Sequence, residues 1–194
     1  FERLEAAVAV SRYELLVKLM NKRTTYQLAV EAGVMVLEET DLDLFERVKS
    51  DLIVKPVRGF GGKGQQILRP GQTLSTAVPD FCRHEYIVQP FLEGAREFSV
   101  DFSIDLNGSV SPLVTRQRIR SFAGFSVLGR TASDRLDVIA AADNLSRHIA
   151  SHGGYGGYNV QFLDHEGGPY LIDVNARFGA SSSLSLQMGT NLQA

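Results

Sequence analysis

At 194 residues, with a hydrophobic fraction of 44% and a net charge of −2, the chain has the size and composition of one sizeable globular domain or of two small lobes. The charge argues against a nucleic-acid partner, and no apolar run approaches the ~20 residues that a membrane span needs. The single Cys82 leaves no internal disulfide to form, which favours a reducing cytoplasm as the expected compartment.

The N-terminal quarter is predicted to be helical. Apolar residues recur at helical spacing over residues 2–20, and residues 22–32 predict a second helix that Gly33 ends. Residues 41–49 predict a short third helix. Residues 52–56 then predict a buried strand that carries Lys55 and stops at Pro56.

A glycine-dense loop, residues 58–64, follows that strand. Glycine lets the backbone approach a phosphate group closely and donate its N–H groups. The loop is not a Walker A motif, because Gly64 is followed by Gln65 rather than by Lys-Ser or Lys-Thr. The pattern favours a flap over a nucleotide, with a ligand-free flexible hairpin loop as the alternative.

The middle of the chain predicts strands at 65–68 and 86–89 around a helix at 73–83. Residues 87–97 form an apolar strand that turns into a short connector. Its backbone could meet an adenine edge and Glu97 could accept hydrogen bonds from ribose hydroxyls; an ordinary connector is the alternative.

From Glu97 to Asp105 apolar and polar residues alternate, which predicts a strand with one buried face. Asn107-Gly108 predicts a hairpin turn, and residues 109–119 the partner strand. Residues 121–131 predict a loop, residues 134–152 a long helix capped by Ser133 or Asp134, and residues 183–188 a short helix. His148 and His152 lie four apart on the long helix; without a partner motif we interpret them as a solvated face.

The C-terminal third holds the most informative pattern, a predicted hairpin made by residues 157–162 and 170–177 around a glycine-rich turn. If residue 161 pairs with 173, one face carries core residues and the other carries oxygen donors that suit Mg²⁺. The expected core side chains are Val160, Phe162, Ile172 and Val174, and the expected donors are Asn159, Gln161, Asp173 and Asn175. The alternative is the ordinary polar face of an antiparallel sheet.

Taken in order, the strand with Lys55, the glycine loop, the connector with Glu97 and the Asp-x-Asn-x-Arg end of the hairpin resemble the ATP-grasp superfamily, in particular the group of carbamoyl-phosphate synthase large subunits and related carboxylate–amine ligases. The resemblance covers residues 22–191. It implies an α+β ATP-grasp fold in a single domain: an N-terminal helical segment (1–49), a small lobe (50–92) and a larger lobe with the metal site (93–194).

The resemblance also implies roles for residues. Lys22 and Lys55 would contact phosphate, Gly61 and Gly62 would belong to the flap, and Glu97 would contact ribose. The connector residues Gln89, Pro90, Phe91 and Leu92 would contact adenine. Gln161, Asp173 and Asn175 would bind Mg²⁺, with Mn²⁺ as a substitute. Arg177 would meet the transferred phosphate, and Arg116 and Arg118 are weaker candidates for substrate or phosphate contact.

Four features depart from many relatives. Asp173 stands where they carry Glu, Ala176 where they carry Pro, and Gln89 where they carry an acidic residue. Only about 50 residues precede the strand with Lys55, so the N-terminal domain of the family is largely missing. We therefore expect either a homo-oligomer or a partner domain that supplies the missing part.

The leading hypothesis is an ATP-dependent ligase that activates a small carboxylate as an acyl phosphate for attack by an amine or a similar nucleophile, with no nucleic-acid and no membrane partner. A nucleotide-binding or assembly module with weak or no catalysis is the second hypothesis. A purely structural α+β domain is the third, and it predicts no nucleotide binding.

Overall fold

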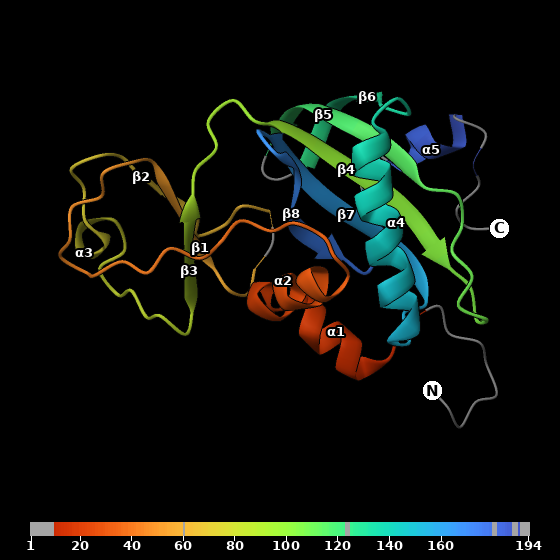
Figure 1. The fold of residues 1–194 in the computed structure, drawn as a ribbon, viewed down its shortest axis with the longest axis horizontal. Coiled ribbons are helices and arrows are strands. Elements are labelled where there is room, and N and C mark those ends of the chain that lie inside the picture. The colour runs from red at the N-terminus through yellow and green to blue at the C-terminus, as the bar shows by residue number, and fades with distance from the viewer. Residues whose placement is uncertain (1–9, 60, 123–124, 180–181, 188–189, 191–194) are drawn as a thin grey trace.

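Two antiparallel sheets form the frame of the protein in a computed structural model that describes residues 10–59, 61–122, 125–179, 182–187 and 190. The small sheet has the strand order β2-β1-β3, and the large sheet has the order β6-β5-β4-β7-β8 (Figure 1). The strands of the small sheet are β1 (Leu52–Pro56), β2 (Gln66–Leu68) and β3 (Tyr86–Pro90). Those of the large sheet are β4 (Arg96–Ile104), β5 (Val114–Phe122), β6 (Phe125–Thr131), β7 (Gly156–His165) and β8 (Gly168–Asn175).

The helices of the described residues are α1 (Tyr13–Leu19), α2 (Lys22–Glu31), α3 (Leu74–Ala77), α4 (Leu136–Ser151) and α5 (Ser183–Gln187). The long helix α4 lies across one face of the large sheet, and α1 and α2 lie beside its lower end in the view of Figure 1. The predicted α+β class is therefore confirmed. Among the described residues, no helix combines the length and the apolar character that a membrane crossing requires.

The large core lies between the large sheet and the helices. Phe98, Val100 and Phe102 of β4 are fully buried there, as are Leu145 and Ile149 of α4. Burying side chains of this size removes a large apolar area from water, which stabilises the fold by roughly 25 cal/mol per Å². The alternating polar residues of β4 consequently face the opposite side of the sheet, as the sequence predicted.

The predicted register of the C-terminal hairpin is confirmed, since Gln161 pairs with Asp173. A bulge next to this pair makes Phe162 the partner of Leu171, so Ile172 is the extra residue. The prediction that Ile172 faces the core is therefore wrong: Leu171 fills the core position, and Ile172 turns toward the opposite face.

One predicted helix is absent and another is much shorter than predicted. Residues 41–49 form an irregular segment because other partners take their backbone groups: the Val48 N–H donates to the Gln72 carbonyl at 2.9 Å, and the Val48 carbonyl accepts from Gly71 N–H at 2.9 Å. The helix expected at 73–83 ends at Ala77. Pro79 disfavours the helical conformation of Val78, whose φ and ψ are −134° and 83°.

Three other element boundaries also differ from the prediction. The first helix begins at Tyr13 rather than near residue 2, and residues 1–9 lie outside the described part of the chain. Strand β5 begins at Val114, not at 109. Helix α4 begins at Leu136 after Arg135 as its N-cap, so neither Ser133 nor Asp134 is the cap.

The segment 121–131, predicted as a loop, is mostly the edge strand β6, which pairs with β5; residues 123 and 124 lie outside the described residues. Its Ser, Gly and Arg content hid the strand pattern. An edge strand has one unpaired side and one exposed face, so it needs little apolar alternation.

Candidate active site between the two sheets

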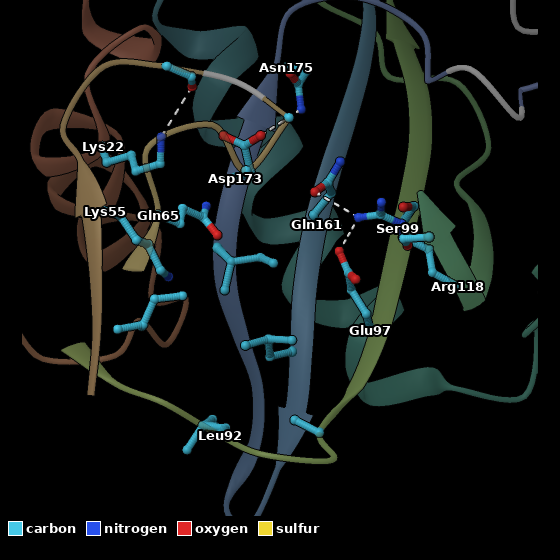
Figure 2. Close-up of a pocket in the computed structure, with 18 of the residues that line it drawn as sticks. Lys22, Lys55, Gln65, Leu92, Glu97, Ser99, Arg118, Gln161, Asp173 and Asn175 are labelled. Carbon is cyan, nitrogen blue, oxygen red and sulfur yellow. Dashed lines mark hydrogen bonds and ion pairs between the residues drawn. The ribbon is translucent and has the colours of Figure 1, made fainter. Parts of the chain in front are cut away.

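A cavity of about 540 Å³ lies between the small sheet and the polar face of the large sheet. This is a common size for a small-molecule site. Its walls come from α2, β1, the glycine loop and the connector after β3 on one side, and from β4, β5, β7 and β8 on the other. Figure 2 shows Lys22 and Lys55 across the cavity from Glu97 and Arg118, with Asp173, Asn175 and Gln161 between them.

Lys55 projects from β1 and is only 6% exposed. Its Nζ donates to Gln89 Oε1 at 3.1 Å. Burial lowers the pKa of Lys55 to about 8; repulsion from Lys22 lowers the pKa further, and Asp173 opposes both effects. A lysine held in this way strongly favours an anionic ligand, because a nearby negative charge offsets the loss of hydration.

Lys22 is the first residue of α2. The Asn21 side chain caps the helix by accepting from Arg23 N–H at 3.0 Å, and the Lys22 N–H donates to the Val57 carbonyl at 2.9 Å. These bonds fix the helix start beside the end of β1. The Lys22 Nζ reaches the Gly59 carbonyl of the glycine loop at 3.3 Å, so this helix N-terminus, its lysine and the loop meet at one corner of the cavity.

Gly61 and Gly62 of the loop both line the cavity. Their φ angles, 66° and 72°, lie in the left-handed region that favours glycine. A Cβ atom added to Gly64 would lie 2.9 Å from Cγ of Pro56. The loop therefore turns tightly over the end of β1, where only glycine fits without strain.

Asp173 and Asn175 belong to the oxygen-rich patch that the sequence predicted, and Asn159 and Gln161 also line the cavity. Asp173 and Asn175 lie two residues apart on β8 and share a hydrogen bond, in which Asn175 Nδ2 donates to Asp173 Oδ2 at 3.0 Å. Gln161 lies beside Asp173 on β7, but its Oε1 accepts from Arg118 at 3.2 Å. Asp173 and Asn175 keep further oxygen lone pairs, and such hard donors fit Mg²⁺ together with phosphate and water.

Glu97 and Arg118 face each other on β4 and β5 and form an ion pair at the cavity wall. Burial raises the pKa of the Glu97 carboxyl, while the charge of Arg118 lowers it. A second ion pair, between Asp101 and Arg116, is fully buried in the large sheet and does not line the cavity. Arg116 is therefore placed as a support of the sheet face and not as a ligand contact.

The connector after β3 lines the cavity on the same side as the lysines. Pro90, Phe91 and Leu92 line it, and the Phe91 N–H donates to the Asp51 carbonyl at 3.0 Å, which ties the connector to the start of β1. Leu163 and Ile172 supply apolar surface from the large sheet. These side chains make this part of the cavity wall apolar.

Arg177 follows β8 and lines the cavity. Its guanidinium donates to the Phe178 carbonyl at 3.1 Å. The chain then packs closely onto the sheet: a Cβ at Gly157 would lie 2.6 Å from the Phe178 ring, and one at Gly179 would lie 2.9 Å from the Asn159 side chain. The backbone around Arg177 is thereby held in place.

The structure thus brings together at one cavity every predicted site residue except Gln89 and Arg116. Gln89 is 1% exposed and sits behind Lys55, where it accepts from Lys55 and donates to the Leu37 carbonyl at 2.6 Å. Sequence reasoning missed the lining residues Ser99, Gln65, Leu163 and Ile172. The alternation of β4 placed Ser99 on the correct face, but nothing in the sequence indicated the bulge that turns Ile172 inward.

Comparison with known proteins agrees with this geometry. The family model of the ATP-grasp domain matches residues 19–181. The chain therefore belongs to the ATP-grasp family, as its motifs predicted, and the ATP-grasp fold is confirmed.

Among curated proteins, the chain is 29% identical over 156 residues to the carbamoyl phosphate synthase large chain of Clostridium beijerinckii, covering 75% of this chain and 14% of that protein. Among solved structures, it resembles the biotin carboxylase domain of Hydrogenobacter thermophilus 2-oxoglutarate carboxylase with magnesium ADP, at a TM-score of 0.78 and 16% identity, over 98% of this chain and 47% of that one.

The D-alanine–D-alanine ligase of Bacillus anthracis complexed with ATP is similar at a TM-score of 0.67 and 17% identity, over 97% of this chain and 66% of that one. The chain thus spans a small part of the curated relative that it matches and about half of the first of these structures.

Proposed function

We propose that this chain is the nucleotide-binding part of an ATP-dependent ligase, which transfers the γ-phosphoryl group of ATP to a carboxylate. The resulting acyl phosphate is then attacked by an amine or a similar nucleophile, and phosphate leaves. The observation that carries the proposal is the cavity itself, where two lysines and a glycine turn face Asp173 and Asn175.

The cationic corner would hold the triphosphate. Lys55 and Lys22 neutralise phosphate oxygens, while the N–H groups of the glycine turn and of the α2 N-terminus donate to them. Phosphoryl transfer needs little covalent chemistry from a protein, so positioning and charge neutralisation carry most of the rate. This agrees with a site that has lysines, arginines and carboxylates facing the cavity.

Asp173 and Asn175 would hold Mg²⁺, whose chemistry is to neutralise the charge of the phosphate oxygens as the γ-phosphoryl group departs. The short carboxylate of Asp173 lies at the edge of the patch nearest to Lys55, whose pKa responds to its charge. Gln161 completes the patch, held in place by Arg118.

The opposite end of the cavity would hold the nucleoside. The backbone of Pro90 and Leu92 would read the adenine edge, with Phe91 beside it, and Ile172 and Leu163 would pack on the ring. Glu97 would accept from ribose hydroxyls. Gln89 would act indirectly, because it holds the Lys55 ammonium in position.

Arg177 and Arg118 would stabilise the reacting phosphate and the acyl phosphate. Both line the cavity on the large-sheet side. The similar proteins named above include a carbamoyl phosphate synthase chain and a D-alanine–D-alanine ligase, and the name of the second denotes the joining of two amino acids. The identity of the acceptor would depend on segments or partners beyond this cavity.

The test combines binding and turnover. Mg-ATP at about 100 times its dissociation constant should raise the free energy of unfolding by about 2.7 kcal/mol, measured by thermal or chemical unfolding. Release of ADP and phosphate should then depend on both a carboxylic acid and an amine from a panel of small metabolites.

Absence of any stabilisation by millimolar Mg-ATP, in protein shown to be folded, contradicts the nucleotide site. Clear binding of Mg-ATP without ADP release for any substrate pair supports the second hypothesis of a nucleotide-binding module without catalysis.

A further inference from the structure

A second cluster of ligand-type side chains lies away from the cavity, where the C-terminal ends of α2 and α4 meet. It consists of Glu31, the last residue of α2, with His148 and His152 from the end of α4. One nitrogen of each imidazole and one carboxylate oxygen all lie within 4.8 Å of one another. The sequence showed only the histidine pair, and α2 supplies the third member through tertiary packing.

The two histidines stand one helical turn apart, so both rings project from the same side of α4. Their ring centroids are 4.4 Å apart at an angle of 52°. Two imidazoles at this spacing on one helix face are a recurrent arrangement for binding zinc. A helix face with merely solvated histidines does not require a carboxylate to sit beside both rings.

Hydrogen bonds already orient two of the three groups. The Nδ1–H of His152 donates to the His148 carbonyl at 2.8 Å, which leaves the lone pair of its Nε2 available to a metal ion. Such a bond from the far ring nitrogen to a backbone carbonyl is typical of metal-binding histidines. Gln27 donates to Glu31 Oε1 at 3.3 Å, and the other oxygen of the same carboxylate, Oε2, faces His148.

His148 supplies the most specific observation. Its Nε2 is buried and makes no hydrogen bond, and it faces Glu31 Oε2 at 3.6 Å, which is too long for one. A buried ring nitrogen without a partner is costly unless something binds it. Zinc with bonds of about 2.0–2.1 Å in tetrahedral geometry places its ligand atoms about 3.3 Å apart, close to this separation.

We propose that Glu31, His148 and His152 bind a divalent transition-metal ion of the zinc class, which joins the end of α2 to the end of α4. Two imidazoles and one carboxylate leave a fourth position for water. The nitrogen donors favour Zn²⁺ or Co²⁺ over Mg²⁺, the opposite preference to the oxygen patch of Asp173 and Asn175. The ion would fasten α2, whose other end carries Lys22 into the cavity.

The experiment is a calorimetric titration of the whole chain with Zn²⁺ in excess Mg²⁺, so that oxygen-donor sites are already filled. We expect one Zn²⁺ per chain, and Co²⁺ should give the intense visible absorption of a four-coordinate site. The variant His148→Gln/His152→Gln should bind Zn²⁺ at least about tenfold more weakly and lose that absorption. Glu31→Gln, which keeps the bond from Gln27 possible, should weaken binding in the same direction.

The matched control is His84→Ala/His165→Ala, which removes two exposed histidines elsewhere and should leave the affinity unchanged. Circular dichroism and thermal unfolding without metal verify that each variant is folded. The proposal is overturned if the His148/His152 variant keeps the wild-type affinity, if the control loses as much, or if Co²⁺ shows only the weak spectrum of a six-coordinate hydrated ion.

Discussion

The two walls of the cavity differ in both charge and support. The wall on the small-lobe side carries Lys22 of α2 and Lys55 of β1, and the core of the small lobe is a small cluster around Val54 and Leu68. The wall from the large sheet carries Asp173, Asn175 and Glu97 over a much larger apolar core. Asn175 donates a hydrogen bond to Asp173, and Glu97 forms an ion pair with Arg118. A ligand that is anionic along one side and cation-binding along the other, such as Mg-ATP, matches both.

Helix α2 connects the two walls. Leu28 and Ala29 pack into the large core, whereas Arg23 forms an ion pair with Glu39 and donates to the Tyr86 carbonyl of β3 at 2.7 Å. Tyr26 is buried between them and donates to the Ile172 carbonyl, in the bulge of β8, at 3.1 Å. Because the small lobe has the smaller core, we expect it to be the part that adjusts to a ligand, while the large sheet supplies fixed positions.

Removing the charge of Asp173 from the fixed wall should have the largest effect on the proposed ligase activity. Asp173→Asn keeps the shape and the hydrogen bond to Asn175, but it removes the only carboxylate charge of the predicted metal patch. We expect ligase turnover to fall by a factor that corresponds to about 2.7–4 kcal/mol, with a much weaker response of ATP binding to Mg²⁺.

Calorimetric titration with ATP at several Mg²⁺ concentrations measures that response, and Asp80→Asn on the exposed outside of the small lobe serves as the control. An unchanged Mg²⁺ response in Asp173→Asn would show that the metal lies elsewhere.

Removing the positive charge of Lys55 from the adjustable wall should have the second-largest consequence. Lys55→Met keeps the length of the side chain but removes its charge, so ATP should bind about ten- to a hundredfold more weakly, whereas adenosine should bind as before. Lys49→Met, at an exposed position of the same lobe, should change neither.

The free energy of unfolding should respond differently to Lys55→Met. A pKa lowered from 10.5 to about 8 means that burying the charged form costs about 3 kcal/mol at neutral pH. Leaving Gln89 Oε1 without its donor costs about 1–3 kcal/mol in the variant. We therefore expect the variant to be as stable as the wild type or up to about 2 kcal/mol more stable; equal losses for ATP and adenosine would contradict the placement of Lys55 at phosphate.

The same lysine predicts a pH dependence of smaller size. In the free protein Lys55 loses its proton near pH 8, whereas bound phosphate would keep it charged, so ATP affinity should fall up to about tenfold per pH unit above pH 8. The stability of the free protein moves the other way: between about pH 8 and 10.5 the unfolded chain binds the extra proton, so stability rises with pH across this window.

Titrations with ATP from pH 7 to pH 10 test this expectation, and Lys55→Arg, which stays charged throughout, should flatten the curve. A profile that is the same in Lys55→Arg and in the wild type would assign the pH dependence to another group.

Particular elements show how far the sequence predicted this site. The register of Gln161 against Asp173 could be predicted because alternation and a short glycine-rich turn leave few ways to pair the strands. Strand β1 and helix α2 also lie where local pattern placed them. These elements carry most of the metal patch and both lysines.

The remainder depended on contacts between distant segments. The bulge at Ile172 changes which side chain enters the cavity, and the position of Gln89 behind Lys55 depends on how β3 pairs with β1. The carboxylate of Glu31 beside His148 arises from the packing of α2 against α4, which are more than a hundred residues apart. No local sequence pattern indicates such neighbours, because the whole fold decides which residues are buried and which residues contact one another.

The smallest expected effect concerns the glycine turn of the adjustable wall. Gly64 and Gly71 both have positive φ angles, 73° and 89°, so alanine at either position should lower the free energy of unfolding by about 1 kcal/mol through backbone strain alone. Their surroundings differ: a Cβ at Gly64 would press on Pro56 at the end of β1, next to Lys55, whereas a Cβ at Gly71 has nothing within 4 Å.

If the turn closes over phosphate, Gly64→Ala should weaken Mg-ATP severalfold beyond its effect on stability, while Gly71→Ala should leave the affinity unchanged. Hydrogen exchange adds the direct readout: Mg-ATP should protect the amides of residues 61–64 in the wild type and protect them less in Gly64→Ala. Wild-type protection that appears only on the large-sheet side would mean that the fixed wall alone binds the nucleotide, and that the small lobe shapes the cavity without closing on its contents.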